Sequence, residues 1–230
     1  MKKILLLTLL LLAGCNGNNS NSSNLYENIP EKIEVNGVSI EASSVNTKNI
    51  DNYLFRDDTV YVDLRPYSEV VKEGHIAGFS FYPYYELIAT FEGYEESIKN
   101  EAGEVIEKIP QDNRLFKYKL ESPVCKVGDF SPNYEESIFL LNELFPKDKY
   151  IFAISQSGLE CHYFFNLLIQ YDYDVSKLYN IGGFAIGTGF HNIAYKNIDD
   201  PKYLVPGNPL IDHEVQNITF DFMRELTPIK

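Results

Sequence analysis

The feature that most constrains the fold is a short apolar run that leads into a polar loop with a single glycine and then into an apolar helical pattern. The run covers 149–154, the loop runs from Ser155 to Gly158, and the helical pattern covers 162–171. Such a run bounded by turn residues predicts a buried strand followed by a helix. Backbone N–H groups in the loop, with a helix N-terminus behind them, form a small anion site that can activate a nucleophile.

A second strand with a following helix lies earlier in the chain. The near-continuous apolar, β-branched run over 59–64 is typical of a buried parallel strand, and Pro66 is well placed to open a helix. A third short strand is predicted within 79–83, with a helix over 84–90. Strands that alternate with helices indicate an α/β fold with a mostly parallel central sheet flanked by helices.

The outer parts of the chain give weaker patterns. A hairpin is predicted over 33–40 around an Asn-Gly pair, and a short helix over 47–54. Beyond Pro201, proline and glycine dominate until 215–226, where a strand or a helix is expected in a C-terminal extension.

The alternation of strands and helices breaks down between about 91 and 130. A helix over 94–100 and a turn at Ala102 and Gly103 are expected there. A lid that sets specificity and an ornamental insertion are both open interpretations.

A further helix is predicted to begin at Ser131, which would cap it, with Pro132 just inside. The side chains expected on its apolar face are Ile138, Leu141, Leu144 and Phe145.

Four segments occur in an order that resembles a known family. The V-D-L-R segment at 62–65, the G-H-I-A-G segment at 74–78 and the loop at 155–161 are similar to the V-D-x-R strand end, G-H-I-x-G turn and C-x-x-G-x-R-[ST] loop of rhodanese-like domains. Residues 174–184 resemble that family's last strand and its Gly-Gly turn. The resemblance implies a rhodanese-like domain over 31–230, with its core at about 47–190 and an insertion at about 91–130.

The loop departs from the family's pattern at the positions that carry its chemistry. Rhodanese-like enzymes hold sulfur as a persulfide on the loop cysteine, but Ser155 stands at that position here, and Glu160 replaces the arginine. A serine oxygen cannot carry a sulfane sulfur, and a carboxylate repels an anion by about 1–4 kcal/mol. The rest of the pocket would be formed by Gln156, Ser157, Gly158 and Leu159. The resemblance therefore implies a degenerate loop and a binding or interaction module.

Cys161 stands where the family has serine or threonine, and it leaves three interpretations open. It fills a small packing slot, or it is a displaced thiol that carries the persulfide of an active thiosulfate or 3-mercaptopyruvate sulfurtransferase, or it pairs with Cys125 in a disulfide.

Asp63 and Arg65 end the strand at the edge of the sheet where ligands of open parallel sheets bind. The resemblance implies that they order the active loop. One hypothesis pairs Arg65 with Glu160, and the alternative is two solvated charges worth about 0–1 kcal/mol. His75, in the G-H-I-A-G segment, is expected to have a structural hydrogen-bonding role.

Other chemistries have less support in the sequence. A serine nucleophile elbow would need glycines where Ala153 and Ser157 stand, although His75, His162 and His191 are available as bases. Cys161 and His162 are adjacent but diverge on a helix, so no metal site and no cofactor are predicted.

Aromatic side chains cluster near the third strand. Strand alternation places Phe79 and Phe81 on one face, so both are candidates for the core. Tyr84 and Tyr85 are expected to be exposed and to offer a surface for a partner or a small ligand.

The N-terminus has the features of an export signal. Lys2 and Lys3 precede an apolar run at 4–12 that is shorter than the roughly 20 residues needed to span a bilayer. The L-A-G-C segment that ends at Cys15 resembles a bacterial lipobox. The resemblance implies a signal peptide at 1–14, lipidation of Cys15, and a flexible tether within 15–30 that holds the domain on a membrane of the cell envelope, outside the cytoplasm.

The chain is acidic, with a formal net charge of −13 that becomes more negative if Lys2 and Lys3 are removed. Nucleic acids and anionic membranes are bound by basic patches, so neither is expected to be bound by charge. The expected partners are the membrane, through the lipid on Cys15, and an unknown small ligand or envelope protein.

Overall fold

The structure is a computed structural model, and it describes residues 28–30, 43–110, 114–121, 126–184, 195, 197, 200–208 and 226–229. Several predictions lie outside these residues: the signal peptide, the lipidated Cys15, the hairpin over 33–40, Cys125 and His191, and nearly all of 215–226. Among the helices that the described ranges contain, none is both long and apolar enough to cross a membrane.

A sheet of four parallel strands forms the centre of the fold, with the order β10-β9-β1-β3. Its strands are β1 (Thr59–Asp63), β3 (Ser80–Phe81), β9 (Tyr150–Ser155) and β10 (Leu178–Gly183). The residues of β1 and β9 are buried almost throughout, as expected for strands covered on both faces. The predicted α/β class with a parallel sheet is confirmed.

Each face of this sheet has its own hydrophobic core. On one face, α3 (Leu159–Gln170) and α2 (Ser137–Leu144) pack with a second sheet. On the other face, the short 3-10 helix η2 (Ile50–Tyr53) covers the strands, within the predicted helix over 47–54. Val62 faces the first core and Tyr61 the second, because successive side chains of a strand point to opposite faces.

The helix predicted after Pro66 is α1 (Tyr67–Glu73), with Pro66 directly before it. The G-H-I-A-G segment that follows does not form a simple turn. Its first three residues form β2 (Gly74–Ile76), which pairs antiparallel with β11 (Leu204–Pro206), and the chain turns only at Ala77 and Gly78.

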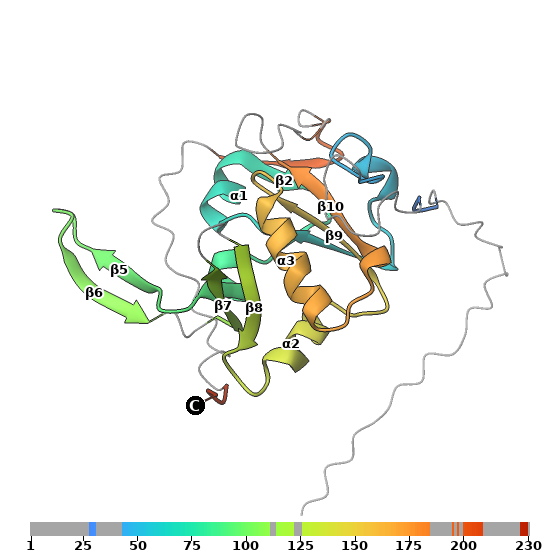
Figure 1. Cartoon of the computed structure of the whole chain (residues 1–230). Coiled ribbons are helices and arrows are strands. Elements are labelled where there is room, and N and C mark those ends of the chain that lie inside the picture. The colour runs from blue at the N-terminus through green and yellow to red at the C-terminus, as the bar shows by residue number, and fades with distance from the viewer. Residues whose placement is uncertain are drawn as a thin grey trace, which may run out of the picture.

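The segment predicted as an insertion is made of strands rather than helices. A π-helix, η3 (Tyr84–Ile88), occupies most of the helix predicted over 84–90, and β4 follows it. The second sheet has the order β4-β7-β8, and a separate hairpin of β5 and β6 projects from the body (Figure 1). The bounds are β4 (Ala89–Phe91), β5 (Glu95–Lys99), β6 (Val105–Pro110), β7 (Phe116–Glu121) and β8 (Lys126–Pro132).

The helix predicted over 94–100 is therefore wrong, whereas the turn at Ala102 and Gly103 is confirmed. The Asn100 side chain accepts hydrogen bonds from the backbone N–H groups of Ala102 and Glu104, and Gly103 adopts a φ of +80°. A turn closed in this way favours pairing of the flanking strands over a helix that would continue through it.

The helix predicted to begin at Ser131 begins six residues later, at Ser137. Ser131 and Pro132 belong instead to β8, where they pair with β7. The predicted apolar face is only partly confirmed: Leu141 and Phe145 are buried, but Ile138 is 41% exposed.

The aromatic cluster is also divided differently from the prediction. Phe79 is buried and packs on Tyr61, whereas Phe81 is half-buried. Tyr85 is 44% exposed as predicted, but the prediction for Tyr84 is wrong because that side chain is only 1% exposed. Tyr84 opens the π-helix and points into the core beneath α3.

Candidate functional site

The order of the strands singles out one edge of the sheet. The chain runs from β1 to β3 on one side and later returns to β9 on the other side of β1, so β1 and β9 flank a switch point. Asp63 lies opposite Ile154 at the carboxyl ends of these strands. Ligands of open α/β sheets bind outside the carboxyl ends of the strands at such a point. The V-D-L-R segment and the loop after β9 meet here.

The loop after β9 is closed on itself. Ser155 is fully buried at the end of β9, and its hydroxyl oxygen accepts a hydrogen bond of 2.8 Å from the backbone N–H of Gly158. Gly158 has a φ of +86°, and its carbonyl oxygen accepts a hydrogen bond from the Asn180 side chain at 3.0 Å. In an open loop the N–H of Gly158 would be free to bind an anion. Here it donates to the hydroxyl of Ser155 instead.

Cys161 lies in the first turn of α3 and is a free thiol with no exposed surface. Burial raises the pKa of this thiol well above its usual value, and the nearby charges of Glu160 and Asp63 act in the same direction. A hydrogen bond with Ser155 lowers the pKa but does not offset burial. Cys161 is therefore a neutral thiol at pH 7, whereas the thiolate is the reactive form.

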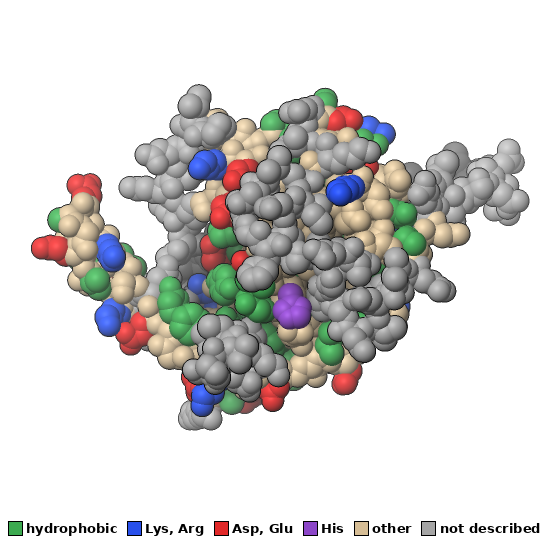
Figure 2. Space-filling view, turned by 45° about the horizontal axis from the view of Figure 1, so that its top comes forward, with side chains coloured by type: hydrophobic (Ala, Val, Ile, Leu, Met, Phe, Trp, Pro, Cys, Tyr) green, Lys and Arg blue, Asp and Glu red, His purple; other side chains and the backbone are tan. Residues whose placement is uncertain are grey.

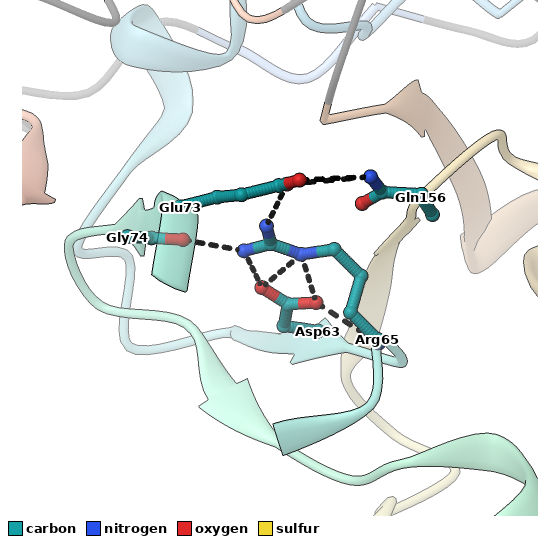
Figure 3. A network of polar contacts seen from close by, with 5 residues as sticks. All are labelled: Asp63, Arg65, Glu73, Gly74 and Gln156. Atoms are coloured by element: carbon teal, nitrogen blue, oxygen red, sulfur yellow. Dashed lines mark hydrogen bonds and ion pairs between the residues drawn. The ribbon is translucent and has the colours of Figure 1, made fainter. Parts of the chain in front are cut away.

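Arg65 lies at the centre of a buried polar network (Figure 3). Its Nε donates to Asp63 at 3.0 Å, and its Nη2 donates to Asp63 at 2.7 Å and to the carbonyl oxygen of Gly74 at 2.8 Å. Its Nη1 contacts Glu73 at 3.4 Å, and the guanidinium lies 3.7 Å from the ring centre of Phe184. Such bidentate pairing fixes the orientation of both side chains.

This network corrects the hypothesis of an ion pair between Arg65 and Glu160. Arg65 pairs with Asp63 and Glu73 instead, and it is not a solvated charge either, because its side chain is fully buried. The loop is joined to the network by another residue: Gln156 donates its Nε2–H to Glu73 at 3.2 Å. The physical reason is proximity, since Asp63 at the end of β1 and Gly74 at the start of β2 already bind the guanidinium.

His75 stands beside this network and is half-buried. Its ring packs edge-on against Phe81, with 4.6 Å between ring centres. Burial lowers the pKa of the imidazole, so His75 is neutral at pH 7 and acts in packing.

Three glutamates belong to the two helices next to the loop: Glu69 and Glu73 to α1, whose Glu73 contacts Gln156 of the loop, and Glu160 to α3. We refer to them as the acidic edge. Among the described residues, Oε2 of Glu69 and Oε2 of Glu160 are buried and accept no hydrogen bond. Burial raises the pKa of Glu69, and the charges of Glu73 and Glu160 raise it further. These partly buried carboxylates make the edge unsuited to thiosulfate or another anion.

Glu69 and Glu73 were not among the site residues predicted from the sequence. A signal was present, because two residues four apart on a helix lie on the same face, and this helix directly follows Arg65. Figure 2 shows acidic side chains next to hydrophobic ones on one face of the molecule. Within the ranges that the structure describes, no group of three or more histidine, cysteine, aspartate or glutamate side chains is arranged to hold a metal ion.

Comparison of the chain with models of known protein families, with curated proteins and with solved structures gave no match.

Proposed function

We propose that this chain is a rhodanese-like lipoprotein of the bacterial cell envelope whose loop no longer carries sulfur and which acts as a binding module. The observation that carries the proposal is the state of the loop. Ser155 stands at the sulfur-carrying position, is fully buried, and uses its hydroxyl to bind the N–H of Gly158. The loop is thus filled by its own side chain and holds no nucleophile at the place where the resemblance expects one.

The arrangement of the motifs supports the rhodanese-like part of the proposal. Of the segments that resemble the family, 62–65 and 74–78 are neighbours in the sequence and the loop at 155–161 is far from both, yet these three meet at one edge of the sheet. Arg65 of the first segment binds Gly74 of the second, and Gln156 of the loop binds Glu73 next to it. Convergence at a switch point is what a ligand-binding edge of an α/β sheet requires.

The rival function, a sulfurtransferase that uses Cys161, has less support. An enzyme of that kind needs an accessible thiol that ionises near neutral pH. Cys161 has no exposed surface, and its pKa is raised well above the usual value by burial. The structure also leaves Cys161 a free thiol, which gives no support to the disulfide. The remaining interpretation of Cys161, a small side chain that fills the core under the loop, supports the binding module.

The envelope part of the proposal rests on the sequence. The segment that ends at Cys15 resembles a lipobox, and a polar tract of asparagine and serine follows it. Since the chain is strongly acidic, we attribute membrane contact to the lipid on Cys15 and not to charge.

The accessibility of Cys161 tests the proposal. We expect iodoacetamide to modify Cys161 at pH 7.5 on the order of 100-fold more slowly in the native protein than in denaturant, because the buried thiol is neutral and must be exposed by opening of the fold. Peptide mapping distinguishes Cys161 from the other cysteines, and Cys161→Ala identifies the peptide. Native modification as fast as in denaturant would favour the displaced-thiol enzyme.

A further inference from the structure

We propose that residues 133–136, together with the exposed start of α2, form a docking surface for an extended peptide segment of another protein. That segment presents a threonine and, two residues later, an apolar residue. The chain's own segment 226–229 occupies residues 133–136 in the structure and acts as an intramolecular competitor. We refer to residues 133–136 as the strip. The inference goes beyond the proposed function, because none of these residues belongs to the loop at the edge of the central sheet.

The segment 226–229 pairs with the strip as two antiparallel strands pair, at the end of the chain marked C in Figure 1. The backbone N–H of Glu135 donates to the carbonyl oxygen of Thr227 at 3.0 Å. The N–H of Ile229 donates to the carbonyl oxygen of Asn133 at 2.9 Å. Main-chain hydrogen bonds of this kind are how proteins bind an extended peptide that adds to an open strand.

The position between these two hydrogen bonds places no demand on the peptide. Pro228 lies there, opposite Tyr134, where the backbone N–H of an antiparallel strand points away from its partner. Proline has no N–H, so it loses no hydrogen bond at this position, whereas a proline at position 229 would lose one. The residue that follows the threonine of a bound peptide is therefore free to vary.

The threonine is selected by the side chain of Glu136. Its Oε2 accepts a hydrogen bond from the backbone N–H of Thr227 at 3.0 Å, and its Oε1 accepts one from the hydroxyl of Thr227 at 2.8 Å. These hydrogen bonds lower the pKa of Glu136, so its carboxylate is ionised at pH 7. Hydrogen bonds to an ionised acceptor are stronger than those between neutral groups. Valine in place of threonine would keep the shape of the peptide and lose one of the two donors.

The strip is held in place by the body of the protein. The N–H of Asn133 donates to the carbonyl oxygen of Leu115 at 2.9 Å, and its side chain donates to the carbonyl oxygen of Arg114 at 2.7 Å. The N–H of Tyr134 donates to the hydroxyl of Ser137 at 3.1 Å. A surface that is already ordered binds a peptide without an ordering cost, so the strip stays available when its own occupant leaves.

The chain's own segment leaves room for a better occupant. Its residues Thr227, Pro228 and Ile229 are exposed, so it gains little from burial of apolar surface. Ile138 and Phe139, which follow the strip, are 41% and 63% exposed. Because the pairing is antiparallel, the residues that precede the threonine of a bound peptide run toward α2, where an apolar side chain can cover Phe139. A partner therefore adds apolar burial that the chain's own segment does not supply.

The test is an NMR titration of the isotope-labelled full-length protein with the peptide acetyl-Phe-Leu-Thr-Pro-Ile-amide. In the variant Ile229→Pro, the chain's own segment loses the N–H that binds Asn133. We expect saturable shifts of the Glu135 amide in this variant, and an affinity about fivefold higher than in the unaltered protein, because the competitor is weakened. Should Ile229→Pro fail to fold, Thr227→Val weakens the same competitor by removing its hydroxyl.

Two glutamine variants, each combined with Ile229→Pro, locate the bound peptide. Glu136→Gln should weaken binding about fivefold, because it removes the ionised acceptor of the threonine. Glu135→Gln is the matched control. It makes the same change of charge on the adjacent residue, which binds the segment through its backbone N–H, and it should leave the affinity unchanged.

Changes in the peptide distinguish a paired strand from non-specific attraction. Valine in place of threonine should weaken binding, whereas alanine in place of proline should leave it unchanged, because that position offers no N–H to the strip. Glycine in place of phenylalanine should weaken binding to the protein with Phe139, and this difference should disappear in Phe139→Ala.

Three results would overturn the inference. The first is that no peptide binds to the Ile229→Pro protein at millimolar concentration. The second is that Glu136→Gln and Glu135→Gln have equal affinities. The third is that binding does not depend on the threonine of the peptide.

Discussion

Replacing Arg65 by alanine is expected to lower the free energy of unfolding by about 3–5 kcal/mol, because the change leaves a buried Asp63 without its counter-charge. Both side chains are fully buried, and Arg65 also binds the carbonyl oxygen of Gly74. Urea unfolding followed by circular dichroism measures the effect. Loss of Arg65 also removes the contact with Glu73 and should loosen the loop through Gln156.

Two variants make this experiment specific. Lys108→Ala removes an exposed ion pair with Glu95 and should cost no more than about 1 kcal/mol. Arg65→Met combined with Asp63→Asn removes both buried charges, and it should cost less than the sum of the two single changes, because neither charge is left unpaired. An Arg65→Ala protein that is as stable as Lys108→Ala would show that the network contributes little.

Gly74→Ala is expected to be strongly disruptive, with a loss of more than about 3 kcal/mol or a failure to fold. Gly74 adopts a φ of +86° and a ψ of −175°, a conformation that is essentially restricted to glycine. A Cβ there would meet the carbonyl oxygen of Val205 and would lie 2.7 Å from the backbone nitrogen of Gly207. Since both contacts are with backbone, β11 would have to move away from β2.

Gly103→Ala separates the conformational cost from the clash. Gly103 also has a positive φ, of +80°, but a Cβ there would meet nothing within 4 Å. We expect this variant to lose only about 1–2 kcal/mol, the cost of a left-handed conformation for alanine. Thermal unfolding of both variants measures the difference. Equal losses would mean that the close approach of β2 and β11 is not required by the fold.

The central strands could be predicted from the sequence because their signals are local. β1, β9 and α3 lie close to their expected places, since a continuous apolar run of strand length between turn residues has few alternatives in an α/β pattern. The edge at which the V-D-L-R segment and the loop after β9 meet also followed, because the carboxyl ends of parallel strands lie together.

Long-range pairing explains what the sequence did not reveal. Ser131 and Pro132 carry the signal of a helix start, but they belong to β8 and pair with β7. The helix begins only at Ser137, whose hydroxyl donates to the carbonyl oxygen of Leu115. The segment 94–100 became a strand for a similar reason, because β6 pairs with it across the turn at Gly103. Local propensity is a weak guide where a partner strand is available.

The site was predictable in its position but not in its contacts. The sequence places Asp63, Arg65 and the loop at one edge, yet it does not show which way the Arg65 side chain turns. The contact of Arg65 with Glu73 also depends on where α1 ends. The burial of Tyr84 was missed for a related reason: the π-helix that carries it is recognised only from its packing under α3.

The most direct test of the central claim is the intact mass of the purified protein before and after incubation with thiosulfate or 3-mercaptopyruvate. We expect no added sulfur, because Ser155 cannot carry it and Cys161 is buried and neutral. One added sulfur atom that is absent in Cys161→Ala would contradict the account and identify an enzyme with a displaced nucleophile.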